Sequence, residues 1–528
     1  MIASTPTTST RIHEDLPDHL LSLLDPSTYP HPVNEISLIQ THISWVFLTG
    51  GYVYKIKKPV DFGFLDFTTL NKRKNACLDE LRLNRRLAPD LYLDVLSIYI
   101  CNDCYLIGKP DESADQIVDY ALQMVQFDQQ DLFSNRLMHG NFNPRWMDQL
   151  GKIIADFHLN ADTNPHIKQY GSPEFLLRHM LENLDIAERN PPAGLSVSDL
   201  KILGAMSSEH MKQLEKRLSE RQQSGYIRDC HGDLHLKNIT LYNSQPTPFD
   251  CIEFSDEFRM IDTMNDVAFL VMDCDSIERS DLGYRFLSRY LERCGDYEGV
   301  DLLPIYLSYR AGVRGKVSSL LAQELMNNEA SSSLEVESLH SQATHYFLMA
   351  KQYLSENQNP ELIVVAGLSG SGKSHLALTA LEHLKAIIIR SDATRKRIAK
   401  DHPELPMYGN EMHRRTYRAM FDAAATTLRA GIPVILDATF LHPASRESAA
   451  ALAAELDVPL TFYWLDINNE TLRERVQQRS RKGVDISDAD LQVLEQQIGQ
   501  HEQPSESYII YIDSSRSWPP IKSSTAIG

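Results

Sequence analysis

Two short motifs in the chain carry residue types that can place nucleotide phosphates and a magnesium ion. The first reads His-Gly-Asp-Leu-His-Leu-Lys-Asn over residues 231–238. The second follows the pattern GxxxxGK[ST] over residues 367–374. The two patterns belong to different folds, so the sequence predicts two separate nucleotide sites in one chain.

The second motif has the surroundings of a phosphate-binding loop. Residues 362–366 form a short apolar run typical of a buried parallel strand, and residues 375–384 can form the following helix. Glycines let backbone N–H groups wrap the phosphates of ATP, and the N-terminus of the helix adds a favourable dipole. We expect Lys373 to reach the terminal phosphates and the Ser374 hydroxyl to bind Mg²⁺. The predicted nucleotide-binding residues are Gly367, Leu368, Ser369, Gly370, Ser371, Gly372, Lys373 and Ser374.

Two aspartates follow the next apolar runs, at residues 386–389 and 434–436. A side chain at the carboxyl end of a parallel strand faces the ligand crevice. Asp392 could therefore accept a proton from a substrate hydroxyl, and it could also cap the helix that follows. Arg395 could position substrate or phosphate. Asp437 would bind Mg²⁺ through water or orient Arg395.

A run of arginines lies in a predicted helix that ends near Gly483, and it comprises Arg473, Arg475, Arg479 and Arg481. Such a run is often a solvated helix face. After a phosphate loop it also suits a lid that closes on ATP and stabilises the transferred charge. We favour the lid for Arg475 and Arg479.

The first motif has the spacing of the protein-kinase catalytic loop, H-R-D-L-x-x-x-N, with glycine in place of arginine. Asp233 would accept the proton of the acceptor hydroxyl, and Asn238 would hold Mg²⁺. A predicted strand at residues 249–254 supplies a further metal ligand. Asp250 and Glu253 lie on opposite faces of such a strand, so only one of them can face the metal.

The lysine that binds the nucleotide is expected on a strand that follows a glycine turn at residues 49–51. Lys55 and Lys57 share one face of this strand. We favour Lys55 and keep Lys57 as the alternative. The ion-pair partner would be Glu80, on a helix predicted over residues 71–87.

These residues resemble two known families. The His-Gly-Asp motif, the D-x-x-x-D-[LV]-A pattern beginning at Asp262, and the Phe-His-Leu segment at residues 157–159 are similar to aminoglycoside phosphotransferases. In that family the magnesium aspartate sits in an Ile-Asp-Phe/Trp tripeptide; the aligned tripeptide, residues 252–254, carries Glu253, so the resemblance favours Glu253 over Asp250. The phosphate loop, Asp392, Arg395, Asp437 and the arginine lid resemble P-loop kinases of the gluconate kinase and polynucleotide 5'-kinase type.

The whole chain resembles proteins described as bifunctional aminoglycoside phosphotransferase/ATP-binding proteins. The resemblance implies an α+β, protein-kinase-like, two-lobed domain followed by an α/β P-loop domain with a parallel sheet. We expect a disordered leader at residues 1–30, the kinase-like domain at 31–355 and the P-loop domain at 356–528. The implied cofactors are ATP and Mg²⁺, and the implied acceptor is a hydroxyl of a small molecule.

Composition and charge limit the classes of partner that the chain is expected to bind. The 528 residues carry a formal net charge of −19, which counts against nucleic acid, although a local basic groove could still bind it. No apolar run is long enough to cross a membrane, and without an export signal we expect a cytoplasmic protein. Cys101 and Cys104 form a lone CxxC, which we interpret as a hairpin turn and not as a zinc or redox site.

Four functions are compatible with these residues. The leading one is an enzyme in which both halves bind MgATP and at least one phosphorylates a small-molecule hydroxyl. In the second, the first half is a regulatory pseudoenzyme. A nucleotide-driven switch is third, and Asp392 argues against it because a switch needs no base for a substrate. The fourth is a nucleic-acid 5'-kinase. No motif specifies the acceptor or the oligomeric state.

Overall fold

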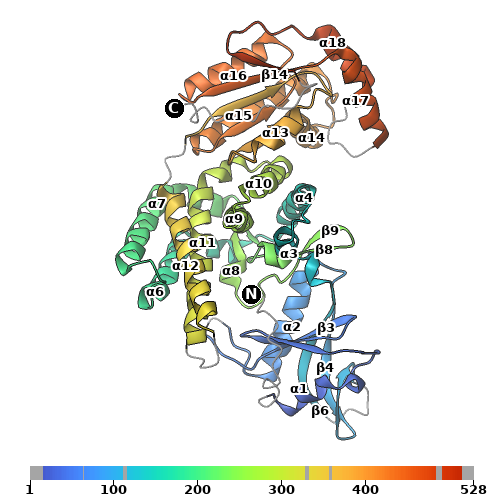
Figure 1. Cartoon of the computed structure of the whole chain (residues 1–528), viewed down its shortest axis with the longest axis vertical. Coiled ribbons are helices and arrows are strands. Elements are labelled where there is room, and N and C mark those ends of the chain that lie inside the picture. Colours follow the sequence, from blue (N-terminus) through green and yellow to red (C-terminus); the bar gives the residue numbers. More distant parts are fainter. Residues whose placement is uncertain are drawn as a thin grey trace. The chain divides into compact units, whose positions relative to one another are not determined.

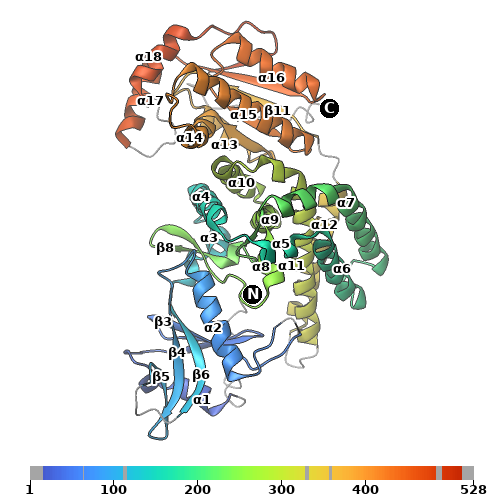
Figure 2. The ribbon, with the colours of Figure 1, turned by 180° about the vertical axis from the view of Figure 1, so that it is seen from behind.

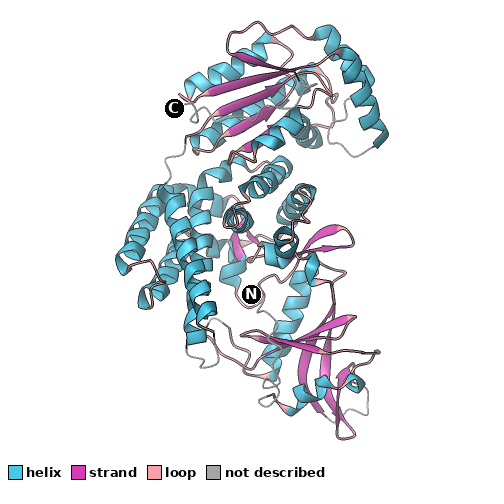
Figure 3. Cartoon of the chain, viewed as in Figure 1, coloured by secondary structure: helices cyan, strands magenta, loops and turns pink. Residues whose placement is uncertain are grey.

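The computed structural model of the protein describes residues 16–63, 65–110, 116–326, 332–355, 359–482 and 490–513, with side chains undescribed at 479–482. The chain divides into two compact units. The first unit comprises Met1–Trp146, Asn160–Ser172 and Glu220–Asp266, and the second comprises Met147–Leu159, Pro173–Ser219 and Val267–Gly528. The two larger sheets come from strands near the two ends of the sequence, and most of the segment between them is helical, with two short strand pairs (Figures 1 and 3). Across these ranges no helix has the length and apolar character needed to span a membrane.

An antiparallel sheet of six strands opens the first unit, in the order β1-β2-β3-β6-β4-β5. Its strands are β1 (Ser37–Gln40), β2 (Ser44–Leu48), β3 (Tyr52–Lys57), β4 (Tyr92–Cys101), β5 (Cys104–Gly108) and β6 (Gln116–Val125). Helix α2 (Leu70–Asn84) connects β3 to β4 and begins at Thr69, whose hydroxyl caps it. The β4–β5 turn has Asn102 and Asp103 at positive φ, which is the hairpin expected for the CxxC segment.

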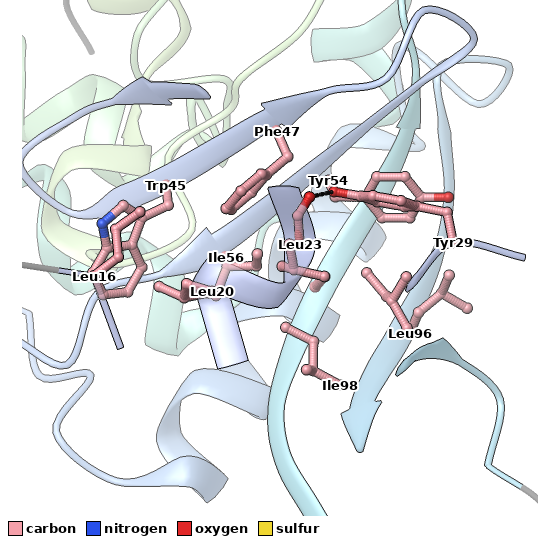
Figure 4. Close-up of a cluster of buried hydrophobic side chains, with 12 residues drawn as sticks. Leu16, Leu20, Leu23, Tyr29, Trp45, Phe47, Tyr54, Ile56, Leu96 and Ile98 are labelled. Atoms are coloured by element: carbon pink, nitrogen blue, oxygen red, sulfur yellow. Dashed lines mark hydrogen bonds between the residues drawn. The ribbon is translucent and has the colours of Figure 1, made fainter. Parts of the chain in front are cut away.

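Residues 16–30 pack onto this sheet, so the expected disordered leader is too long. Helix α1 (Asp18–Leu21) and two 3₁₀ turns place Leu20 and Leu23 in a core with Phe47 and Tyr54 of the sheet (Figure 4). Leu20 and Leu23 are fully buried. Burial of these apolar side chains offsets the entropy of ordering the segment. Residues 1–15 lie outside the described part of the chain.

The rest of the first unit frames the first motif. Strands β7 (Ile227–Asp229) and β10 (Met260–Asp262) pair antiparallel, and β8 (Ile239–Tyr242) pairs with β9 (Gln245–Pro248). Residues 231–238 run from β7 to β8, so both strand pairs hold the ends of the motif. Short helices complete the unit: α3 (Phe133–Met138), α5 (Pro165–Lys168) and α8 (Asp256–Arg259).

Helices make up the first part of the second unit, as Figure 2 shows from behind. They are α4 (Arg145–Asn160), α6 (Pro173–Arg189), α7 (Val197–Gln223), α9 (Thr263–Asp275), α10 (Ser280–Cys294), α11 (Leu303–Met326) and α12 (Ser333–Ser355). The residues at the ends of α4, at the C-terminus of α7 and at the N-terminus of α9 are assigned to the first unit. Helix α12 ends at Ser355 and the next strand begins at Leu362, on either side of the expected domain boundary.

A parallel sheet of five strands completes the second unit, in the order β12-β13-β11-β14-β15. Its strands are β11 (Leu362–Ala366), β12 (Ile387–Arg390), β13 (Val434–Asp437), β14 (Leu460–Asp466) and β15 (Ile509–Asp513). The connecting helices are α13 (Lys373–Ala380), α14 (Ser391–Asp401), α15 (Asn410–Arg429), α16 (Pro443–Glu455), α17 (Asn469–Lys482) and α18 (Leu491–Gln500). Every residue of β11, β12 and β13 is buried, which explains their unbroken apolar runs. The fold class predicted from the sequence is confirmed.

Candidate active sites

The loop at residues 231–238 is held by a buried carboxylate. Asp266 accepts hydrogen bonds from the backbone N–H groups of His231, at 3.2 Å, and Gly232, at 2.8 Å. Gly232 has φ +85°, and a Cβ atom there would lie 2.8 Å from the carbonyl oxygen of Phe258. Glycine therefore fits where the protein-kinase pattern has arginine.

Asp233 and Asn238 meet at the centre of this loop. The Asn238 side-chain amide donates to Asp233 Oδ2 at 2.8 Å and to the Asp233 carbonyl oxygen at 3.0 Å. His235 Nε2 lies 3.4 Å from Asp233 Oδ2. The two residues predicted as base and metal ligand thus share one site.

Two buried lysines on β3 share one glutamate of α2. Lys55 Nζ lies 2.7 Å from Glu80 Oε1 and 2.8 Å from Asp250 Oδ1. Lys57 Nζ lies 2.5 Å from Glu80 Oε2 and also contacts Glu253. Lys55 is the lysine that joins Glu80 to Asp250.

The charges of this cluster are set by burial and by one another. Burial lowers the pKa of Lys55, but Asp250 and Glu80 outweigh it, so the pKa is raised well above its ordinary value. Burial raises the pKa of Glu80, and Lys55 and Lys57 reverse the effect to lower it. For Glu253 burial dominates, so its pKa is raised despite the contact with Lys57.

The segment after β9 is not the strand expected at residues 249–254. Strand β9 ends at Pro248, and Asp250 has φ +62°, a conformation that interrupts a strand and costs about 1–3 kcal/mol. The turn brings the Asp250 carboxylate to Lys55. Burial and the charge of Asp233 raise the pKa of Asp250, and Lys55 lowers it. Glu253 lies fully buried against Lys57. The residue kept as the alternative metal ligand therefore lies beside the predicted nucleotide lysine.

The phosphate loop of the second unit connects β11 to α13. Gly367, Gly370 and Gly372 have φ of +138°, +86° and +100°, and a Cβ atom at Gly367 would lie 2.7 Å from the Leu465 carbonyl oxygen. The Ser371 hydroxyl oxygen is buried and has no hydrogen-bond partner among the described residues. An unsatisfied buried hydroxyl inside a glycine-rich cradle fits the nucleotide phosphates predicted from the sequence.

The residues predicted around the phosphates converge at the carboxyl edge of the sheet. Ser374 Oγ donates to Asp437 Oδ2 at 2.6 Å, and Lys373 Nζ donates to the Leu368 carbonyl oxygen at 3.0 Å. Burial raises the pKa of Asp437, although Lys373 and Ser374 act in the opposite direction. These donors are of the kind that bind Mg²⁺ and phosphate.

Asp392 lies in the first turn of α14, directly after β12. Arg395 Nη1 donates to Asp392 Oδ1 at 2.8 Å, so Asp392 and not Asp437 orients this arginine. Helix α14 begins at Ser391 with Arg390 at the N-cap position, so Asp392 lies within the first turn and is not the N-cap residue. The Asp392 side chain is 33% exposed and can meet a substrate.

The predicted lid arginines separate into different environments. Arg475 Nη1 lies 3.4 Å from the Gly370 carbonyl oxygen, next to the phosphate loop. Arg473 pairs with Glu495 at the surface instead. The side chain of Arg479 lies outside the described residues. Helices α17 and α18 pack on the loop through a buried cluster that includes Leu368, Leu472, Val476 and Leu494.

Sequence reasoning missed an aromatic group beside Arg395. The guanidinium lies 5.2 Å from the centre of the Tyr408 ring. Burial lowers the pKa of His413, and the Arg395 charge lowers it further. The ring centres of His413 and Tyr417 are 4.6 Å apart. The Tyr417 hydroxyl also accepts a hydrogen bond from the backbone N–H of Phe440. These residues come from α15 and its preceding loop, which carry no motif.

The chain thus has a part before residue 356 whose motif resembles aminoglycoside phosphotransferases, called the kinase-like or phosphotransferase-like half, and a P-loop half whose parallel sheet carries the phosphate loop. A family model described as an AAA domain matches residues 362–504. The sequence is 29% identical over 468 residues to an uncharacterized protein of Mycobacterium tuberculosis, covering 87% of this chain and 89% of that one. An uncharacterized protein of Mycobacterium bovis matches to the same extent.

Solved structures resemble the two halves separately. A choline/ethanolamine kinase family protein from Mesorhizobium loti is 12% identical, with a TM-score of 0.39, covering 61% of this chain and 89% of that one. A gluconokinase from Sinorhizobium meliloti is 22% identical, with a TM-score of 0.24, covering 31% of this chain and 86% of that one.

Proposed function

We propose that the protein is an ATP- and Mg²⁺-dependent phosphotransferase with one nucleotide site in each half, acting on the hydroxyl of a small molecule. The observation that carries the proposal is the arrangement at the P-loop edge. There a glycine-rich cradle, the Ser374–Asp437 hydrogen bond and the Asp392–Arg395 pair meet at the carboxyl ends of adjacent strands.

In the P-loop half the protein's own residues divide the work. Loop amides and Lys373 bind the phosphates, and Ser374 and Asp437 would hold Mg²⁺, which when bound neutralises charge on the phosphates. Asp392 accepts the proton of the acceptor hydroxyl. Arg395 fixes the carboxylate of Asp392. Arg475, which lies next to the phosphate loop, offsets the charge that develops on the transferred group, and the sequence assigns the same role to Arg479.

In the kinase-like half, Asp233 takes the proton and Lys55, held by Glu80, binds the nucleotide phosphates. Asn238 would hold Mg²⁺ together with one acid. We propose Asp250 for that acid in preference to Glu253. Asp250 contacts Lys55, and it is near enough to Asp233 for the Asp233 charge to raise its pKa. Glu253 then serves to neutralise the buried Lys57.

A specific observation supports a second candidate, in which the kinase-like half only binds nucleotide. The turn between β2 and β3 contains three residues, 49–51, and is too short for a GxGxxG phosphate cover. Such a half could sense ATP and regulate the P-loop half. Binding of MgATP without turnover after Lys373→Ala would favour this candidate.

The test of the P-loop assignment separates binding from transfer. Lys373→Ala should abolish nucleotide binding at this site, whereas Asp392→Asn should keep binding and reduce transfer by about 10²-fold or more. Lys400→Ala removes an exposed lysine of α14 and serves as the matched control. Full transfer by Asp392→Asn would refute the assignment of the base.

A further inference from the structure

The edge strand of the P-loop sheet is covered by a helix of the phosphotransferase-like half. Strand β12 pairs with β13 on one side only, yet all four of its residues are buried. Helix α10 lies against its other side within the same compact unit. The backbone N–H of Ile388 donates to Ser288 Oγ of α10 at 3.0 Å, and this hydrogen bond is buried.

A buried ion-pair chain continues from this contact. Arg390, the last residue of β12, binds both carboxylate oxygens of Glu292, which lies 98 residues earlier on α10. Arg289 Nη1 donates to the same two oxygens, each at 2.9 Å, and Arg289 Nε donates to Asp148 of α4 at 2.8 Å. The Arg390 and Glu292 side chains are 10% and 5% exposed. Breaking one member of such a chain leaves an uncompensated buried charge.

Arg390 connects these buried ion pairs to the P-loop site. The next two residues are Ser391 and Asp392, the predicted base, and the register partner of Arg390 on β13 is Asp437. Burial lowers the pKa of Arg390, but Glu292, Asp437 and Asp148 together outweigh burial and raise the pKa above its ordinary value. Three carboxylates therefore act on the Arg390 guanidinium, and its hydrogen bonds go to both oxygens of Glu292.

We infer that Glu292 is a positioning residue of the P-loop site. By holding the Arg390 guanidinium it fixes the strand end that carries Asp392, and it keeps Arg390 from pairing with Asp437. The phosphotransferase-like half thus supplies part of the support of the P-loop site. The inference rests on the function proposed for the P-loop half, so its test includes a measurement that needs no turnover.

The experiment uses the full chain with Glu292→Gln, which keeps the shape of the side chain and removes its charge. Glu506→Gln is the matched control, since Glu506 pairs with the buried Arg446 of α16 and shortly precedes β15, the strand at the opposite edge of the sheet. Glu292→Asp keeps the charge on a shorter side chain, for the case in which Glu292→Gln does not fold. Glu292→Gln combined with Arg390→Gln removes both charges.

Two readouts decide the inference. Amide hydrogen exchange at residues 387–395, without nucleotide, should be faster in Glu292→Gln and unchanged in Glu506→Gln. The Mg²⁺ concentration that half-saturates the Lys373-dependent binding of ATP should rise about tenfold in Glu292→Gln, as expected when a group that orients the metal-binding residues is lost. It should return toward wild type in the double variant, and Glu292→Asp should fall between wild type and Glu292→Gln.

Wild-type exchange and wild-type Mg²⁺ dependence in Glu292→Gln would overturn the inference. An equal change in both readouts for Glu506→Gln would also overturn it, because the effect would then be general destabilisation. If wild-type protein shows no Lys373-dependent binding, the function proposed for the P-loop half fails instead. The exchange measurement then still decides whether Glu292 positions the strand end.

Discussion

Gly232 determines the conformation of the loop that carries the predicted base, Asp233. Its φ is positive, and the Phe258 carbonyl oxygen lies only 2.8 Å from the position that a Cβ atom would take, so both features require glycine. The two N–H groups that Asp266 receives lie on this turn and its neighbour. A side chain at residue 232 would therefore displace the loop that carries Asp233.

We predict that Gly232→Ala lowers the free energy of unfolding by about 1–3 kcal/mol and abolishes any transfer that depends on Asp233. Gly140→Ala is the control, because Gly140 also has positive φ but no described atom lies within 4 Å of its Cβ position. Chemical denaturation of both variants measures the difference. Equal losses in the two variants would show that the contact with Phe258 has no cost.

Asp250 and Glu253 are the alternative carboxylate ligands for Mg²⁺ in the kinase-like half, and single substitutions distinguish them. We predict that Asp250→Asn weakens Mg²⁺-dependent nucleotide binding in the kinase-like half about tenfold or more. Glu253→Gln should leave Mg²⁺ dependence near wild type while lowering stability, since Lys57 loses a buried partner. Titration of each variant with MgATP, in a Lys373→Ala background, measures this. The reverse pattern would restore Glu253 as the metal ligand.

Elements were predictable where one physical signal dominated. Strand β11 occupies the predicted residues 362–366, and β3 follows the predicted glycine turn, because an apolar run marks the first and the turn marks the start of the second. Strand β15 was missed since it is an edge strand with only Ile509 and Ile512 buried. The supporting role of Asp266 and the contact of Glu292 with Arg390 were also missed, because they join residues far apart in the chain and leave no local pattern.

Helix α1 provides a direct test of the corrected leader. Leu20 is fully buried in the sheet core, whereas its neighbour Leu21 is 36% exposed. We predict that Leu20→Ala lowers the free energy of unfolding by about 2–5 kcal/mol, and that Leu21→Ala changes it by about 0.5 kcal/mol or less. Equal effects in thermal or denaturant unfolding would mean that the segment does not pack on the sheet.

The contact between α10 and β12 has a pH signature. Burial raises the pKa of Glu292, but Arg289 and Arg390 reverse this and hold it below its ordinary value of 4.5. The ionised carboxylate therefore stabilises the fold above about pH 4.5, and the contribution declines as the pH falls below that value. The difference in melting temperature between wild type and Glu292→Gln should shrink from pH 7 toward pH 4. A difference that stays constant with pH would contradict the ion pair.

In the molecule as a whole, two candidate phosphate sites of different fold lie in one chain. The P-loop edge strand contacts helix α10, which precedes residue 356. We therefore expect the proposed activity of the P-loop half to fall when the chain is cut at residue 356. The two halves can still have separate acceptors, because each contains its own candidate base.

The most direct test of two working sites is transfer of labelled phosphate from ATP into a pooled metabolite extract by three forms: wild type, Asp233→Asn and Asp392→Asn. We predict that each variant loses a different labelled product, or that both interrupt successive steps on one product. Unchanged products in Asp233→Asn, together with full loss in Asp392→Asn, would contradict transfer by the kinase-like half. Wild-type products in both variants would contradict the central claim.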